Sequence, residues 1–314
     1  MSVSVRSFAK INLGLRIGAR REDGFHELLT VYQTIGLHDL IRISVRRGSG
    51  IEIRCDDQRV PRDESNTCYR IVEKAVSALG ARGRVVIEIE KRLPVQGGLG
   101  GASSNAGAAM LGLERVLKKQ LTGEQRLRIA AEVGSDVPLF LIGGTVLGLG
   151  RGEQVYPLED LPPMACIVVM PEIGVSTPKA FAEWDRKLTA PHASDRMGEL
   201  GRGLSAWLSE SYSGAPRVRG RRENPLLELV RAGIKNDFEE VVFPEYPELS
   251  EGKKALERAS AKYASLSGSG SALYGLFASD AEARAAAEKL RKRGWIAQAT
   301  ATITRQQYWK GIWR

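Results

Sequence analysis

Residues 94–106 read Pro94-Val95-Gln96-Gly97-Gly98-Leu99-Gly100-Gly101-Ala102-Ser103-Ser104-Asn105-Ala106, with two adjacent glycine pairs followed by two serines. A strand-like run, 85–89, precedes this loop, and a helix-forming run, 106–119, follows it. Glycines let the backbone approach a ligand closely, and the N-terminus of a following helix adds partial positive charge. The stretch therefore predicts a phosphate-binding loop between a strand and a helix, and it favours a nucleotide-binding kinase.

Two better-known phosphate loops do not fit this stretch. The Walker A loop needs Lys and then Ser or Thr after its last glycine, where this chain has Ala102 and Ser103. The dinucleotide fingerprint needs a third glycine, and counted from Gly98 that position falls on Ser103. A turn that only joins a strand to a helix remains the simple alternative, although such turns usually need fewer glycines.

The composition is typical of a globular protein. The chain has 314 residues, of which 43% are hydrophobic and 26% charged, so it can bury a large core in one to three domains. The longest apolar stretch, 137–149, is interrupted by glycines and too short for a bilayer, so we expect no membrane association. Arg6 and Lys10 interrupt the first apolar segment, so we expect no signal peptide and a cytoplasmic location. The three scattered cysteines indicate neither a disulfide framework nor a zinc site: Cys55, Cys68 and Cys166.

The net charge of +9 fits either a nucleic-acid-binding protein or an enzyme of polyphosphate substrates. The excess is spread along the chain, with one cluster between Pro216 and Pro225 that has no interleaved aromatics for base stacking. We interpret this cluster as a solvated basic loop and expect no nucleic-acid partner. Its members are Arg217, Arg219, Arg221 and Arg222.

Hydrophobic periodicity predicts an α+β protein in two halves, 1–155 and 156–314, with the boundary in the stretch 150–163. The expected strands are 2–17, 40–45, 85–89, 166–170, 272–277 and 297–303. The expected helices are 66–79, 106–117, 124–133, 179–184, 197–209, 226–230, 249–260 and 281–292.

Two polar residues in apolar surroundings are candidates for catalysis. Asp136 stands directly before an apolar run, either as a helix cap or as a base near a substrate hydroxyl. Lys10 shares one strand face with Asn12, and it is either a solvated lysine or a partner of that carboxylate. Together Asp136 and Lys10 would accept a proton and stabilise developing negative charge.

Three further segments are candidates for substrate binding. Phe25 and His26 follow a turn, and an aromatic face beside a hydrogen-bonding ring suits a nucleobase, although a structural role is more usual. The segment 174–181 offers a second aromatic ring, or simply a helix start. The segment 267–271 is a second glycine–serine loop, between flanks that are typical of a core.

Taken in order, these segments resemble the GHMP kinases, and the resemblance covers nearly the whole chain. It rests on 9–13, 21–28, 91–106, 134–138, 150–153, 175–178, 236–238 and 267–270. The resemblance implies a two-domain GHMP kinase fold, with an N-terminal ribosomal-protein-S5-domain-2-like half and a C-terminal ferredoxin-like half. It also implies ATP-dependent phosphorylation, with Mg²⁺, of a hydroxyl on a cytidine diphosphate-linked alcohol in non-mevalonate isoprenoid precursor biosynthesis.

The resemblance also implies roles for individual residues. Asp136 would be the base and Lys10 its partner, while Phe25 and Phe181 would sandwich the cytosine and His26 would bond its edge. The ATP side would comprise Asn66, Lys91, Pro94, Val95, Gln96, Gly97, Gly98, Leu99, Gly100, Gly101, Ala102, Ser103 and Ser104. The further acceptor-side residues would be Asn12, Thr177, Ser267, Gly268 and Ser269. No metal ligand is assigned, and Ser104 is a weak candidate.

Three positions and one long basic stretch, 186–222, depart from the family's usual pattern, and none removes a catalytic group. Ala102 stands where a glycine is frequent, Gln96 where a small residue is common, and Phe25 where a tyrosine is frequent. The alternatives are a homoserine- or mevalonate-type GHMP kinase, a non-enzymatic nucleic-acid-binding relative, and an inactive scaffold. A kinase of the other types would leave the aromatic residues Phe25, His26 and Phe181 without a role.

Overall fold

The first half is built on a mixed sheet with two very long strands. The computed structural model describes residues 2–187, 193–212 and 235–314. The sheet has the order β3-β4-β2-β5-β6, and β1 pairs with β2; β3 and β4 are parallel, and the other pairs are antiparallel. Its strands are β1 (Ser2–Arg20), β2 (His26–Arg46), β3 (Ile51–Cys55), β4 (Arg84–Glu90), β5 (Thr145–Leu149) and β6 (Gln154–Pro157).

The helices of the first half begin where the sequence supplies caps. Asn66 accepts from the Cys68 amide and begins α1 (Thr67–Ala78), and Thr122 forms a capping box at α3 (Gly123–Val133). Helix α2 (Gly101–Leu117) is different, because its N-cap is Gly100 in the left-handed region and offers no side chain. A short 3₁₀ helix, η1 (Pro138–Leu141), follows α3.

The second half is a four-stranded antiparallel sheet with helices. Its strand order, β10-β7-β9-β8, is that of a ferredoxin-like unit, as the sequence predicts. The strands are β7 (Ala165–Val169), β8 (Tyr263–Leu266), β9 (Leu273–Phe277) and β10 (Ala297–Ala301). The helices are α4 (Thr177–Lys187), α5 (Ala193–Tyr212), α7 (Glu239–Glu245), α8 (Pro247–Arg258) and α9 (Asp280–Lys292).

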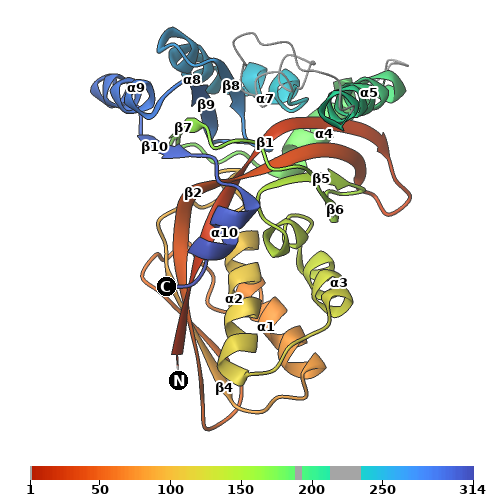
Figure 1. Ribbon diagram of the computed structural model, residues 1–314, viewed down its shortest axis with the longest axis vertical. Helices are drawn as coiled ribbons and strands as arrows, with labels where there is room; N and C mark the ends of the chain where they lie inside the picture. The colour runs from red at the N-terminus through yellow and green to blue at the C-terminus, as the bar shows by residue number, and fades with distance from the viewer. Residues whose placement is uncertain (1, 188–192, 213–234) are drawn as a thin grey trace.

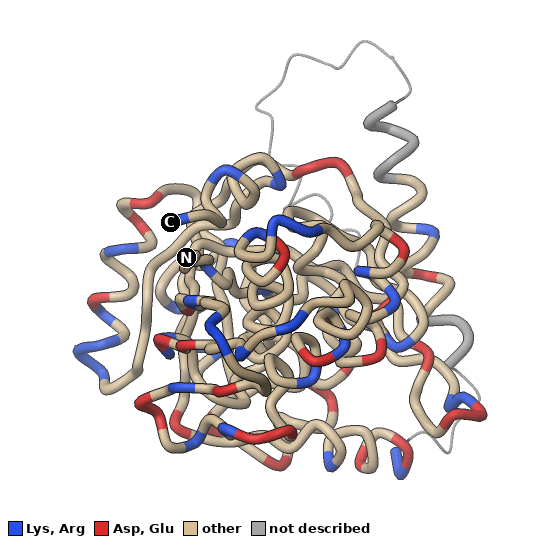
Figure 2. The backbone as a smooth tube through the Cα atoms, turned by 90° about the horizontal axis from the view of Figure 1, so that it is seen from below, with Lys and Arg blue, Asp and Glu red and all other residues tan. Residues whose placement is uncertain are grey.

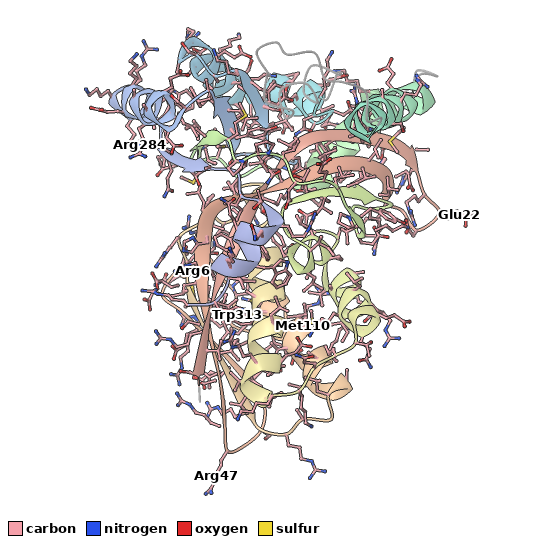
Figure 3. All side chains as sticks on the ribbon, viewed as in Figure 1. Arg6, Glu22, Arg47, Met110, Arg284 and Trp313 are labelled. Carbon is pink, nitrogen blue, oxygen red and sulfur yellow. The ribbon has the colours of Figure 1, made fainter. Side chains whose placement is uncertain are left out.

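Two connections join the halves. Strands β1 and β2 run from the lower half into the upper half in Figure 1, and residues 7–18 of β1 are buried throughout. The chain end returns to the first half as α10 (Arg305–Gly311), where the Tyr308 hydroxyl donates to the Phe140 carbonyl over 2.7 Å. Arg6 and Trp313 lie side by side in Figure 3, and the Arg6 guanidinium donates to the Gly311 carbonyl over 2.6 Å.

Most expected elements occur, but two begin earlier than expected: β2 at His26 instead of residue 40, and α2 at Gly101 instead of residue 106. Residues 29–35 are all buried and therefore show no period-two alternation, and the glycine-rich loop passes directly into the helix. The segments not foreseen are β3, β5, β6, η1, α7 and α10. The expected helix over 226–230 and the basic cluster at 217–222 lie outside the described residues. The three cysteines are buried and free. In Figure 2 basic and acidic positions are interspersed along the described chain, and none of its helices is long and apolar enough to cross a membrane.

Candidate active site

A cavity of about 550 Å³ lies where the glycine-rich loop, β1, β2 and the second half meet. Its lining includes every site residue expected from the sequence except two serines, Ser104 and Ser267. Both of these are buried and hydrogen-bonded to backbone carbonyls, Ser104 to Phe8 and Ser267 to Gly98. The segments that the sequence nominated separately therefore surround one space.

The glycine-rich loop is held by its carbonyl groups. The Gly97 carbonyl accepts from the Ala272 amide over 3.0 Å, and the Gly98 carbonyl accepts from the Ser267 hydroxyl over 2.9 Å. The Leu99 carbonyl accepts from the Lys10 amide over 3.0 Å. The first N–H groups of α2, like those of any helix, have no intrahelical partner. Because no side chain caps them, they suit an anion.

Two glycines of this loop are required by close approach. Gly98 has φ +72°, and a Cβ there would overlap the Ser267 carbonyl oxygen. Gly100 has φ +70°, and a Cβ there would lie 2.9 Å from the Phe140 ring and 3.0 Å from Lys10 Cγ. The loop is thus packed directly against the second half on one side and against the Lys10 side chain on the other.

A buried carboxylate anchors the segment that enters the loop. Asp39 is 0% exposed and accepts from four donors: the Arg92 and Leu93 amides, Lys91 Nζ at 2.7 Å and Asn105 Nδ2 at 3.0 Å. The Lys91 ammonium neutralises this buried carboxylate, so it helps to hold the segment that enters the loop in place. Lys91 also lies at the cavity wall, where a Cβ on Gly101 would be 3.5 Å from its Nζ.

Lys10 and Asp136 meet at the centre of the cavity. Lys10 Nζ lies 3.2 Å from Asp136 Oδ2 and donates to Asn12 Oδ1 over 2.7 Å. The Tyr32 hydroxyl donates to Asp136 Oδ1 over 2.9 Å, and burial, followed by the Asp136 charge, holds the pKa of Tyr32 well above its usual value. Asp136 is not a helix cap, because the N-cap of η1 is Val137 and has no side-chain bond.

The second glycine–serine loop covers the same centre from the other half. A Cβ on Gly268 would lie 3.5 Å from both Lys10 Nζ and Asn12 Oδ1. Asn236 Nδ2 fixes this loop by donating to the carbonyls of Leu266 and Gly268 over 2.9 and 2.8 Å. The hydroxyls of Thr177 and Ser269 are 2.7 Å apart at the cavity wall.

The aromatic residues expected at the acceptor side contact one another and charged side chains. Phe181 stacks on His26, with ring centroids 4.8 Å apart and planes 5° from parallel, and His26 Nε2 lies 2.6 Å from Asp185 Oδ1. Phe25 is 50% exposed, and the Arg151 guanidinium lies 4.8 Å from its ring centroid. The three aromatics line one end of the cavity, but His26 already covers one face of Phe181.

Asn66 has a structural task besides its place in the lining. Its side chain caps α1 and donates to the Pro61 carbonyl over 2.6 Å. Thr67 donates to the Ala102 carbonyl over 2.8 Å, which ties the start of α1 to the glycine-rich loop.

Sequence reasoning missed five residues around the cavity: Tyr32, Asp39, Arg151, Asp185 and Asn236. Tyr32 and Asp39 lie inside a long strand, where a polar side chain gives no local signal of its partner. Asn236 lies in a segment that carried the family resemblance, and that was the only available signal.

The comparisons with known proteins agree with this arrangement. Residues 66–144 match the family model of the GHMP kinases N terminal domain, and residues 221–295 match the model of the GHMP kinases C terminal. A crystal structure of 4-(cytidine 5'-diphospho)-2C-methyl-D-erythritol kinase matches with a TM-score of 0.73 at 30% identity, over 95% of this chain and 98% of that one. A homoserine kinase from Cytophaga hutchinsonii matches with a TM-score of 0.71 at 22% identity, a likeness of fold alone.

Fold and family models together define the chain as a GHMP kinase, an ATP-dependent kinase of small molecules. The 4-diphosphocytidyl-2-C-methyl-D-erythritol kinase of Solibacter usitatus is 39% identical over 87% of this chain and 80% of that relative. The kinase of the same name from Desulfitobacterium hafniense is 34% identical over 96% of this chain and 97% of its own length. The chain belongs to this 4-diphosphocytidyl-2-C-methyl-D-erythritol kinase family.

Proposed function

We propose that this kinase transfers the γ-phosphoryl group of ATP to a hydroxyl of 4-diphosphocytidyl-2-C-methyl-D-erythritol, a step of non-mevalonate isoprenoid precursor synthesis. The observation that carries the proposal is the Lys10–Asp136 pair at 3.2 Å, beside a phosphate loop in one cavity. The choice of acceptor rests on the named relatives, up to 39% identical to this chain.

Asp136 is proposed as the base. It is the only Asp or Glu among the described residues that line the cavity, and its side chain is 29% exposed. The carboxylate would accept the proton of the substrate hydroxyl as that oxygen attacks phosphorus. Lys10 keeps the carboxylate ionised and stabilises negative charge on the transferring group.

The ATP phosphates are proposed to lie on residues 94–103, at the open N-terminus of α2. The N–H groups there and the helix dipole favour negative charge. Mg²⁺ bound with ATP would supply charge neutralisation on the β- and γ-phosphates. Ser103 is the hydroxyl that the cavity offers near it, whereas the Ser104 hydroxyl is already bonded to the Phe8 carbonyl.

The acceptor is proposed to lie at the end of the cavity formed by both halves, 1–155 and 156–314. Its cytosine would contact Phe25, His26 and Phe181. Arg151, whose guanidinium now lies over the Phe25 ring, would either move away from that ring or stack with the base. Asn12 and the loop 267–269 would lie near the alcohol. A homoserine or mevalonate acceptor would leave these aromatics without a partner.

The acceptor class is tested by ADP release from ATP and Mg²⁺ with three alcohols in separate reactions. We expect turnover with 4-diphosphocytidyl-2-C-methyl-D-erythritol and none above background with mevalonate or homoserine. Equal turnover with homoserine would refute the proposed acceptor. RNA binding with a steep salt dependence and no ATP turnover would instead support the nucleic-acid-binding alternative.

A further inference from the structure

Tyr32 is a buried tyrosine whose hydroxyl reaches the proposed base. It lies on β2, opposite Asn12 of β1 and Val146 of β5, and its ring belongs to a small apolar cluster with Leu139 and Phe140. The residue is 2% exposed, yet it also borders the cavity.

Two glycines make the slot that holds this ring. A Cβ on Gly148 would lie 2.5 Å from Tyr32 Cε2, and a Cβ on Gly152 would overlap the Tyr32 hydroxyl. Gly152 has φ +100°, a conformation that other residues rarely adopt. Since neither glycine position has room for a side chain, the Tyr32 ring fits closely between them. In this orientation its hydroxyl points at Asp136.

The carboxylate of Asp136 has a different partner on each oxygen. Tyr32 donates to Oδ1 over 2.9 Å, and Lys10 Nζ lies 3.2 Å from Oδ2. Lys10 Nζ also lies 5.6 Å from the centroid of the Tyr32 ring, so the three groups form one cluster. Two separate anchors fix both the position and the plane of a carboxylate, whereas one anchor leaves it free to turn.

We propose that Tyr32 is a positioning residue that orients the Asp136 carboxylate toward the acceptor hydroxyl. The inference rests on the proposed function, and it adds a third member to the Lys10–Asp136 pair. Because the phenol stays protonated at neutral pH, it donates to the carboxylate and does not compete for the substrate proton.

Among the described residues, Glu153 and Arg151 are the further charged groups with an interaction in this part of the cavity. Glu153, in the turn before β6, acts on Tyr32 through its charge and lies 3.8 Å from Arg151 Nε. The neighbours from η1 are the apolar side chains Leu139 and Phe140. Removing the Tyr32 hydroxyl therefore leaves Lys10 as the partner that holds the Asp136 charge.

The test is Tyr32→Phe, which keeps the ring in its slot and deletes the hydroxyl. We expect kcat to fall about tenfold with both KM values nearly unchanged, because the base is misoriented while both substrates still bind. The matched control is Tyr308→Phe, which deletes another buried hydroxyl, one that donates to the Phe140 carbonyl and not to Asp136, and which is expected to leave kcat and both KM values unchanged.

A second pair of variants guards against a purely structural effect. Gly152→Ala pushes on the Tyr32 hydroxyl and is expected to lower kcat more than Tyr32→Phe does. Because the double variant has no hydroxyl to collide with, its kcat is expected to recover toward that of Tyr32→Phe, while the backbone strain of alanine at φ +100° remains. If the kcat losses of Gly152→Ala and Tyr32→Phe simply multiplied in the double variant, the Tyr32 hydroxyl would not be what a side chain at position 152 displaces, and the inference would be overturned.

One readout does not depend on the acceptor. A crystal structure of Tyr32→Phe is expected to show the Asp136 carboxylate turned from its orientation in the unmodified kinase, because one of its two anchors is gone. An unchanged carboxylate orientation together with an unchanged kcat overturns the inference even where the acceptor is turned over. A turned carboxylate in a kinase that does not use the cytidine-linked alcohol supports the orientation by Tyr32 and refutes the proposed acceptor instead.

Discussion

Gly98→Ala tests whether the glycine-rich loop must be packed against the second half to bind ATP. At φ +72° an alanine costs roughly 1–2 kcal/mol in backbone strain. The new Cβ would overlap the Ser267 carbonyl oxygen and lie 2.9 Å from the Gly270 carbonyl oxygen, so the loop must shift. That shift breaks the bonds from Ser267 to Gly98 and from Ala272 to Gly97, each worth about 1 kcal/mol.

The expected total is about 3–4 kcal/mol, divided between lost stability and lost ATP affinity. Urea unfolding measures the first, and calorimetric titration with ATP and Mg²⁺ measures the second. We expect the apparent Kd for ATP to rise at least about tenfold, because a displaced loop no longer presents its N–H groups to the phosphates.

Gly80→Ala is the matched control for this prediction. Gly80 has φ +55° but has no atom within 4 Å of the position of a Cβ, so the substitution adds backbone strain without overlap. We expect it to lose about 1–2 kcal/mol of stability and to keep its ATP affinity. If Gly98→Ala lost no more than this control and bound ATP equally well, the argument from close packing would be refuted.

Three further predictions concern the buried Asp39–Lys91 ion pair, acceptor binding at Phe181, and the surface pair of Asp57 and Arg59. Asp39→Asn leaves the buried Lys91 charge without its partner, and urea unfolding should show a loss of about 3 kcal/mol or more. Phe181→Ala should raise KM for the cytidine-linked alcohol about tenfold or more and leave KM for ATP unchanged, since base stacking contributes roughly 1–3 kcal/mol. The hydrogen bonds from Arg59 lower the pKa of Asp57 from its usual 3.8 to about 2. Their contribution to folding stability is therefore fully present above pH 3.8 and is lost as the pH falls toward 2. Carboxyl NMR titration should return the Asp57 midpoint toward its usual value in Arg59→Ala.

The loop and the caps could be predicted from sequence because their signals are local. The glycine pairs of 97–101 mark a strand-to-helix turn, and Asn66 and Thr122 are found as helix caps. Strand β5 was missed because the glycines in and around it resemble a loop, although Gly148, inside the strand, is needed by the close approach of the Tyr32 ring.

Contacts between residues far apart in the sequence could not be predicted from this one sequence. Tyr32 and Asp136 are 104 residues apart, and neither position carries a pattern that names the other. The resemblance to known kinases supplied the place of Lys10 beside Asp136, which spacing alone left open. The cytosine sandwich of Phe25 and Phe181 stays a prediction, and the structure adds a stack of the His26 ring on Phe181 that the sequence does not indicate.

In the proposed mechanism Asp136, held by Lys10 and Tyr32, takes the proton of the acceptor hydroxyl. The most direct measurement is single-turnover phosphoryl transfer to 4-diphosphocytidyl-2-C-methyl-D-erythritol in Asp136→Asn, with binding of both substrates measured separately. We predict a transfer rate lower by about 10²–10⁴ with both affinities within a few fold of the unmodified kinase. Transfer at the unmodified rate, or a loss explained entirely by weaker binding, would contradict the account.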